Sequence, residues 1–230
     1  MEHCADEQEG QHTSWIELGI WGHRGIMLCR MKRFQRICVY CGSRSGNRPA
    51  YTRAAVRLGT LLAEREIGLV YGGGSIGLMG KIADAVLANG GSVTGVIPQK
   101  LHELEVGHAR LTEMIVVDSM HTRKRRMAEL SDGFIAMPGG YGTLEELAEV
   151  TTWTQLNDHL KPVGLLNIEG YWDPLLAQIE RMVQDNFVRP LHAGLISNAN
   201  APEALLTQMA EARIPLLEEW IGEARRQKGR

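Results

Sequence analysis

Two glycine-rich stretches are the part of this sequence best suited to chemistry. GGGSIG spans residues 72–77, and PGGYGT spans residues 138–143, just ahead of the adjacent carboxylates Glu145 and Glu146. Glycine-rich turns that open a helix bind phosphate, because their bare backbone amides lie at the positive end of the helix dipole. A carboxylate just past such a turn could bind the sugar that a phosphate carries, activate water, or stabilise positive charge at C1′.

The first stretch matches GxGxxG, yet it does not favour a dinucleotide cofactor. That fingerprint follows the first strand of its domain and precedes an acidic residue about 20 positions later. Here it follows the second predicted strand, and the third ends in Val96, Ile97, Pro98 and Gln99, without an acid. Neither stretch ends in the GK[ST] of a P-loop, so a monophosphate fits better than a triphosphate.

The two glutamates have a plainer explanation, since acidic residues are common in the first turn of a helix. Adjacent helical residues point about 100° apart. One of the pair can therefore face a ligand while the other faces solvent or a second subunit.

A cluster of basic residues opens the helix predicted at residues 120–131, MHTRKRRMAELS. Arg123 and Lys124 lie toward the active edge of the sheet, where a guanidinium could bind phosphate through two hydrogen bonds. Arg125 and Arg126 are typical of a solvated helix face, and His121 is typical of a structural residue, with proton transfer as its alternative role.

The elements that position these residues alternate along the chain from about residue 36. Short apolar runs predict strands at 36–42, 67–74, 92–98, 113–119, 132–140 and 161–168. Helical periodicity or capping predicts helices at 48–66, 77–91, 120–131, 142–157, 171–186, 201–211 and 214–226, with a polar loop at 99–113. This order predicts a Rossmann-like three-layer α/β/α sandwich around a parallel sheet of about six or seven strands.

Ligands of such sheets bind outside the carboxyl ends of the strands. The unusual residues lie at those ends: Ser43, residues 72–77, Asp118 and residues 138–143. The topology therefore predicts the place of the site before any motif is considered.

Composition sets the limits for the other classes of function. The 230 residues are 44% hydrophobic and 23% charged with a formal net charge of −2, which provides no basic field for nucleic acid. We find no apolar run long enough for a membrane span, which needs about 20 residues. Cys38 and Cys41 form a CxxC with no second metal-ligand pair, so we expect buried strand cysteines, a reducing cytoplasm and no metal.

Residues 1–30 show neither helical nor strand periodicity, and Met31 begins a segment typical of a natural start. We expect residues 1–30 to form a disordered extension, whose protection in hydrogen exchange would contradict that expectation. Residues 31–230 are expected to form a single domain.

Three motifs in order, YGGGSIGLMG, MHTRK and PGGYGTLEE, resemble the Lonely Guy family of cytokinin-activating phosphoribohydrolases, many of which were labelled lysine decarboxylases. The similarity runs from about Arg36 to Asn186. Arg44 stands where a small residue is common, and the first 30 residues have no counterpart in the family.

The resemblance implies hydrolysis of the N-glycosidic bond of a nucleoside 5′-monophosphate, a cytokinin riboside monophosphate or AMP, to free base and ribose 5-phosphate. It implies no cofactor and a homodimer with sites near the subunit boundary. It places catalytic roles on Arg123 and Glu146. Substrate contacts would fall on Gly73, Gly74, Glu105, Lys124, Gly139, Gly140, Tyr141, Gly142, Thr143, Leu144, Glu145 and Thr152.

Two alternatives stay open. A decarboxylase would use pyridoxal phosphate on a lysine, and Lys81, Lys100, Lys124 and Lys161 all lack a compelling context. A non-catalytic nucleotide or phosphate-ligand carrier on the same sheet is the stronger alternative. Such a carrier would gain little from a carboxylate near phosphate, so the presence of Arg123 together with Glu146 favours an enzyme over a carrier.

Overall fold

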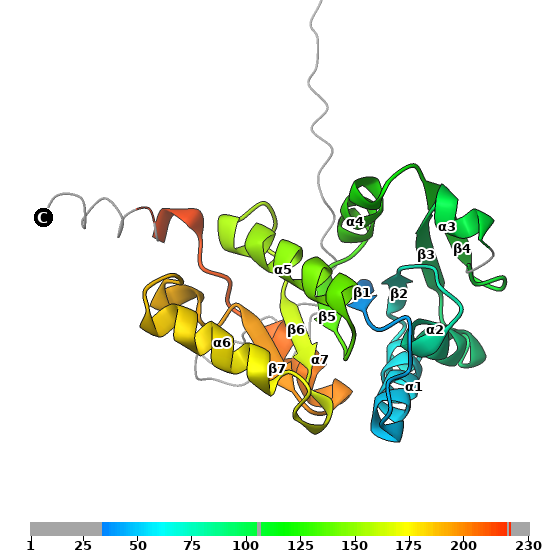
Figure 1. The fold of residues 1–230 in the computed structure, drawn as a ribbon, viewed down its shortest axis with the longest axis horizontal. Helices are drawn as coiled ribbons and strands as arrows, with labels where there is room; N and C mark the ends of the chain where they lie inside the picture. Colours follow the sequence, from blue (N-terminus) through cyan, green and yellow to red (C-terminus); the bar gives the residue numbers. More distant parts are fainter. Residues whose placement is uncertain (1–33, 105–106, 220, 222–230) are drawn as a thin grey trace, which may run out of the picture. The chain divides into compact units, whose positions relative to one another are not determined.

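The computed structural model describes residues 34–104, 107–219 and 221. The predicted disordered extension, residues 1–30, lies outside these ranges. The strands are β1 Arg36–Tyr40, β2 Gly68–Tyr71, β3 Val93–Pro98, β4 Glu113–Val117, β5 Gly133–Ala136, β6 Val163–Leu166 and β7 Ile196–Ala199 (Figure 1). The helices are α1 Pro49–Glu64, α2 Gly77–Ala88, α3 Gln99–Glu103, α4 Met120–Glu129, α5 Tyr141–Leu156, α6 Asp173–Gln184 and α7 Pro202–Glu211, with 3-10 turns η1 Ile168–Gly170 and η2 Pro190–His192.

The strands form one seven-stranded sheet in the order β4-β3-β2-β1-β5-β6-β7, and all neighbouring pairs are parallel. The chain winds outward in one direction from β1 to β4, then returns to place β5 on the other side of β1. The strand order therefore reverses between β1 and β5, and ligands of open α/β sheets bind at such a switch point.

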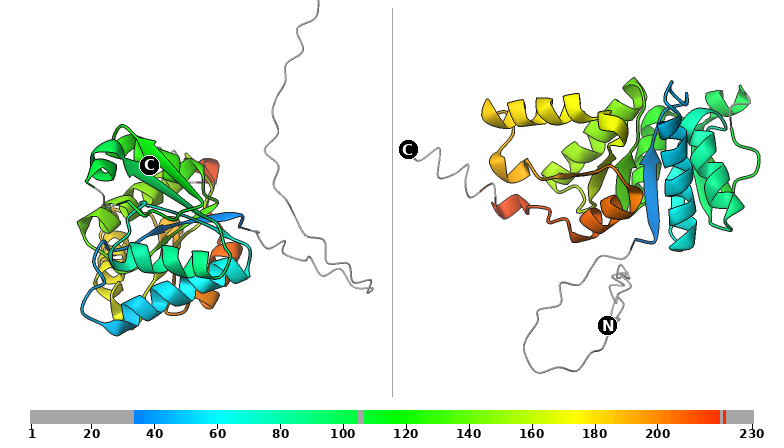
Figure 2. Two further views of the ribbon diagram at one scale, coloured as in Figure 1. Left: turned by 90° about the vertical axis from the view of Figure 1, so that its right-hand side faces the viewer. Right: turned by 90° about the horizontal axis from the view of Figure 1, so that it is seen from below.

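Two hydrophobic cores lie on the two faces of this sheet. One joins the sheet to α1, α2 and α7, and the other joins it to α4, α5 and α6. In Figure 2 the yellow helix α6 and the orange helix α7 lie on opposite sides of the sheet. The predicted three-layer α/β/α architecture is confirmed.

The structure corrects the prediction at two weakly patterned segments. The predicted polar loop at 99–113 contains α3, a five-residue helix that buries none of its residues. The edge strand β7, ISNA, was not among the predicted runs, because it carries a single large apolar residue and pairs only with β6. Short elements at the margin of a fold bury too little apolar surface to leave a periodic pattern.

Cys38 and Cys41 are free and buried, as predicted, and they belong to the two different cores. Alternation along the strand directs them to opposite faces of the sheet, which separates the two thiols. Within the described ranges, no group of three or more His, Cys, Asp or Glu side chains could hold a metal ion. No helix in the described part of the chain is long and apolar enough to cross a membrane.

Candidate active site

A cavity of about 270 Å³ opens at the carboxyl ends of β1 and β5, where the strand order reverses. Its walls come from the β1–α1 loop, the end of β2, the inner face of α4 and the first turns of α5. The lining residues are Val39, Tyr40, Cys41, Gly42, Ser43, Gly72, Met79, Met120, Arg123, Met127, Gly140, Tyr141, Gly142, Thr143, Glu145 and Glu146.

The N-terminus of α5 forms the polar wall of this cavity. Its N-cap is Gly140, which has no side chain to accept from the first amides of the helix. These amides are therefore left to a ligand or to water, at the positive end of the helix dipole. The buried Thr143 adds a hydroxyl in the same turn, and it packs so closely on Gly139 that a Cβ there would lie 2.1 Å from Thr143 Oγ1.

Arg123 and Glu146, to which the resemblance assigns the catalytic roles, both line the cavity and contact each other. Arg123 Nη1 donates to Glu146 Oε1 at 2.8 Å, and the two side chains are only 10% and 9% exposed. Arg123 Nε also donates to the Val96 carbonyl at 3.1 Å. The guanidinium is therefore held by a second hydrogen bond that does not depend on the carboxylate.

Gly72 allows the guanidinium to occupy this place. A Cβ built on Gly72 would lie 2.1 Å from Arg123 Nη2, so no other residue type fits without displacing the side chain. Gly72, the first glycine of GGGSIG, therefore leaves the space that the Arg123 guanidinium occupies.

Burial raises the pKa of the Glu146 carboxyl above its usual range, and the Arg123 guanidinium opposes that rise. A carboxylate that is nearly enclosed and balanced by one cation is typical of catalytic acids and bases. The neighbouring Glu145 has a side chain that is 55% exposed. Both glutamates line the cavity, but Glu146 is the enclosed one and Glu145 the more exposed one.

Lys124 lies beside the site but not on the cavity. Its side chain is 7% exposed, and its Nζ donates to Glu145 and, at 3.1 Å, to Glu149. These ion pairs tie α4 to α5 one residue away from the Arg123–Glu146 pair. The geometry favours a structural role over the substrate contact that the resemblance implied.

The variant Lys124→Met tests this role. We expect it to lower the free energy of unfolding by about 1–3 kcal/mol, because the half-buried carboxylate of Glu149 loses its partner together with that of Glu145. KM for a nucleotide should change less than about threefold, since Nζ does not reach the cavity. Arg126→Met, which removes an exposed ion pair with Glu129 on the same helix, is the control and should shift stability by less than about 0.5 kcal/mol. A tenfold rise in KM with unchanged stability would return Lys124 to substrate binding.

The GGGSIG stretch, residues 72–77, is built differently from the prediction. Leu78 N at the start of α2 donates to the Gly42 carbonyl at 3.1 Å, and the backbone of Ser43 and Arg44 lies against Gly77. This part of the chain therefore covers the N-terminus of α2, which we had expected to bind an anion. The Gly73 and Gly74 carbonyls accept from His108 N at 2.9 Å and Tyr71 Oη at 3.1 Å.

Several predicted contacts do not reach the cavity. Gly73, Gly74 and Leu144 do not line it. Thr152 is exposed on α5 and donates its hydroxyl to the Ala148 carbonyl at 2.7 Å. Asp118 follows the edge strand β4, away from the switch point. Glu105 lies outside the described residues.

Other lining residues were missed by sequence reasoning. Ser43 had been noted only as a strand-end residue, and the methionines Met79, Met120 and Met127 had not been noted at all. Strand order would have identified Gly42 and Ser43, because they follow β1 at the switch point. Methionines on amphipathic helices carry no comparable signal.

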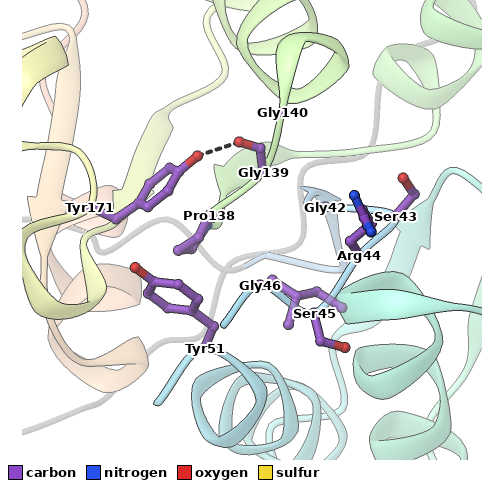
Figure 3. A pocket seen from close by; sticks show the side chains of 11 residues that line it. Gly42, Ser43, Arg44, Ser45, Gly46, Tyr51, Pro138, Gly139, Gly140 and Tyr171 are labelled. Carbon is purple, nitrogen blue, oxygen red and sulfur yellow. Dashed lines mark hydrogen bonds between the residues drawn. The ribbon is translucent and has the colours of Figure 1, made fainter. Parts of the chain in front are cut away.

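A second cavity, of about 210 Å³, adjoins the first and shares Gly42, Ser43 and Gly140 with it. Figure 3 shows Tyr51 and Tyr171 on one side of it, and Ser43 and Arg44 on the other. The β5–α5 loop, Pro138 to Gly140, therefore separates two compartments of one crevice.

A parallel sheet with a glycine loop and a buried Arg–Glu pair at its switch point is typical of Rossmann-like proteins that bind phosphorylated ligands. The profile of the family described as "Possible lysine decarboxylase" matches residues 79–209. A cytokinin riboside 5′-monophosphate phosphoribohydrolase of Arabidopsis thaliana is 51% identical over 179 residues, covering 78% of this chain and 82% of the relative. A rice enzyme of the same name (Oryza sativa subsp. japonica) is 50% identical over 182 residues, covering 79% and 75%.

Among solved structures, the molybdenum cofactor binding protein from Rippkaea orientalis superposes with a TM-score of 0.57. It is 27% identical and covers 74% of this chain and 92% of its own. The chain is about half identical to these plant enzymes over most of its length. It therefore belongs to the Lonely Guy family of cytokinin riboside 5′-monophosphate phosphoribohydrolases.

Proposed function

We propose that this chain hydrolyses the N-glycosidic bond of cytokinin riboside 5′-monophosphates, AMP or both, and releases free base and ribose 5-phosphate. The observation that carries the proposal is the buried Arg123–Glu146 ion pair, which lies on the same cavity as the uncapped N-terminus of α5. Relatives at about half identity bear the same activity in their names.

Each part of the site has a role in this reaction. The first amides of α5 and the Thr143 hydroxyl would hold the 5′-phosphate, whose binding energy then orients the sugar. Glu146 would stabilise positive charge on C1′ as the bond to the base breaks, or direct the water that forms the new C1′–O bond. The electron pair of the broken bond leaves with the base, which takes up a proton. Arg123 would hold Glu146 ionised and balance charge on the phosphate side.

The base would occupy the apolar end of the cavity, beside Met79, Met120 and Met127. Methionine adapts to irregular apolar groups, which suits an N6-prenyl substituent as well as bare adenine. A comparison of kcat/KM for the two nucleotides distinguishes these substrates.

We also propose a homodimer and a cytoplasmic location, with residues 31–230 as one hydrolase domain. Large apolar side chains are exposed on the cavity lining and beside it in the chain: Tyr141 is 93% and Met120 46% exposed, and Leu144, which follows the lining residue Thr143, is 39% exposed. Exposed apolar groups gathered at one place are typical of a protein interface. A monomeric mass in light scattering at micromolar concentration would contradict the dimer. Among the described residues, the free cysteines Cys38 and Cys41 suit a reducing compartment.

A non-catalytic carrier is the second candidate, favoured by the likeness of the fold to a molybdenum cofactor binding protein. The two candidates differ in the fate of the bound nucleotide. Purified protein is incubated with AMP and, separately, with isopentenyladenosine 5′-monophosphate, and free base is measured by chromatography. Release of base supports the hydrolase, whereas tight binding without release supports the carrier.

The pH dependence of the reaction follows from the raised pKa of Glu146. If the ionised carboxylate acts, kcat/KM falls as the pH is lowered through that pKa. The midpoint of this acid limb should lie above the ordinary glutamate value of about 4.3. Initial rates between pH 4 and 8, with stability confirmed at each pH, test this expectation. An acid limb centred at or below the ordinary value would exclude Glu146 as the ionised group.

A further inference from the structure

The β6–α6 turn, residues 167–172, reaches across to the loop that the proposed function assigns to phosphate. It contains two residues in the left-handed region, Glu169 at φ 52° and Gly170 at φ 72°. Such a conformation is costly for glutamate and persists only where the surroundings hold it. Here Asn167 Oδ1 accepts from Trp172 N at 2.8 Å, and the Glu169 carboxylate pairs with Arg48 at 3.0 Å.

This turn delivers Tyr171 to the β5–α5 loop. The Tyr171 hydroxyl donates to the Gly139 carbonyl, as Figure 3 shows. Its ring meets Tyr51 of α1 edge to face at a centroid distance of 5.7 Å and Trp172 at 4.9 Å. The ring is therefore held from two sides, and its hydroxyl is fixed on one backbone oxygen.

The peptide that Tyr171 holds is one with little intrinsic preference for its orientation. It joins Gly139 to Gly140, and a rotation of this peptide changes only ψ of the first residue and φ of the second. Both are glycines, which tolerate either sign of φ, and Gly140 has open space within 4 Å of where a Cβ would stand. The preceding carbonyl, Pro138 O, is already fixed by Gly42 N at 3.0 Å.

The orientation of this peptide decides whether its N–H or its carbonyl oxygen faces the crevice. In a planar trans peptide the C=O and the N–H point in opposite directions. With the Gly139 carbonyl held on Tyr171, the Gly140 N–H points away from Tyr171. Gly140 lines both compartments of the crevice at the start of α5. A flipped peptide would turn a carbonyl oxygen, which repels phosphate, toward the position that the amide now occupies.

We propose that Tyr171 is a positioning residue for the phosphate of the substrate, acting through the Gly139–Gly140 peptide. The inference rests on the proposed function for the identity of the substrate. It assigns a role to a side chain outside the Arg123–Glu146 cavity, on the far side of the β5–α5 loop.

The test is Tyr171→Phe, which keeps the ring and removes only the hydroxyl. We expect KM for AMP and the dissociation constant of ribose 5-phosphate, measured by calorimetry, each to rise about tenfold (~1.4 kcal/mol). The value of kcat should change less than about threefold, because the variant weakens the hold on the phosphate equally in the bound substrate and in the transition state. Binding of adenosine, which lacks the phosphate, should stay the same. A merely structural role would weaken adenosine and ribose 5-phosphate alike.

Tyr51→Phe is the matched control. Tyr51 lines the second cavity, as Tyr171 does, and its hydroxyl makes no hydrogen bond within the described part of the chain. Removal of this hydroxyl should therefore leave KM for AMP and the dissociation constant of ribose 5-phosphate unchanged. The inference is overturned if Tyr171→Phe binds ribose 5-phosphate as tightly as wild type, if adenosine binding falls by the same factor, or if wild type binds no ribose 5-phosphate. If wild type releases no base but Tyr171→Phe still weakens ribose 5-phosphate binding, the proposed function fails and the positioning role stands.

Discussion

Glu146→Gln is expected to lower kcat for base release by about 100-fold or more, the scale of losing a catalytic acid or base. Glutamine keeps the shape of the side chain and can still accept the hydrogen bond from Arg123 Nη1. What it loses is the negative charge that would stabilise the cation developing on C1′. Ribose 5-phosphate should bind about as tightly as before, because the proposed phosphate contacts lie at the start of α5.

The control for this variant is the neighbouring residue. Glu145→Gln changes an exposed carboxylate on the same helix turn, and it should alter kcat by less than about threefold. Single-turnover assays with isopentenyladenosine 5′-monophosphate would separate chemistry from product release. Full activity in Glu146→Gln would exclude its charge from the mechanism, and an equal loss in both variants would point to a general effect of charge on α5.

Arg123→Ala is expected to cost both activity and stability, and the two effects are separable. The variant leaves Glu146 buried without a counter-charge, which destabilises a protein by about 3–5 kcal/mol when both groups are enclosed. The pKa of Glu146, already raised by burial, should rise further without the guanidinium. A raised pKa in the folded state means that stability is retained at low pH and lost as the pH rises through that pKa. The deficit should therefore shrink as the pH is lowered.

The double variant Arg123→Ala/Glu146→Gln makes this expectation sharper. It removes the buried charge together with its partner, so it should recover part of the stability that Arg123→Ala loses at neutral pH, and none of the activity. Gly72→Ala is a complementary probe, because its Cβ would displace the guanidinium while keeping the charge in the protein. Denaturant unfolding at pH 5 and pH 8 measures the coupling. A double variant no more stable than Arg123→Ala at pH 8 would show that the pair is not coupled in the folded state.

The strong parts of the pattern predicted the fold. Strands β1, β2, β3, β5 and β6 are buried along most of their length and read as continuous apolar runs, as expected for a parallel sheet covered on both faces. The segments that the sequence misjudged, α3 and β7, lie at the margins of the fold and bury little. Their conformation is decided by neighbours that are distant in the chain.

The sequence by itself determined the parallel sheet and the glycine loop at the start of α5, and its family resemblance singled out Arg123 and Glu146 as the groups to test. These features are local in the chain or are marked by motifs. Only the tertiary structure decided which of these charges line the cavity: Arg123 and Lys124 are both buried, but α5 offers them different partners and only Arg123 lines the cavity.

Tertiary structure alone also decided that backbone from the β1–α1 loop covers the start of α2, while the start of α5 stays open. The physical reason is the strand order, since β1 and β5 are neighbours in space although 92 residues, 41–132, lie between them in the chain. The contact of Tyr171 with Gly139 has the same origin, because it joins two strand-end loops that no local pattern relates.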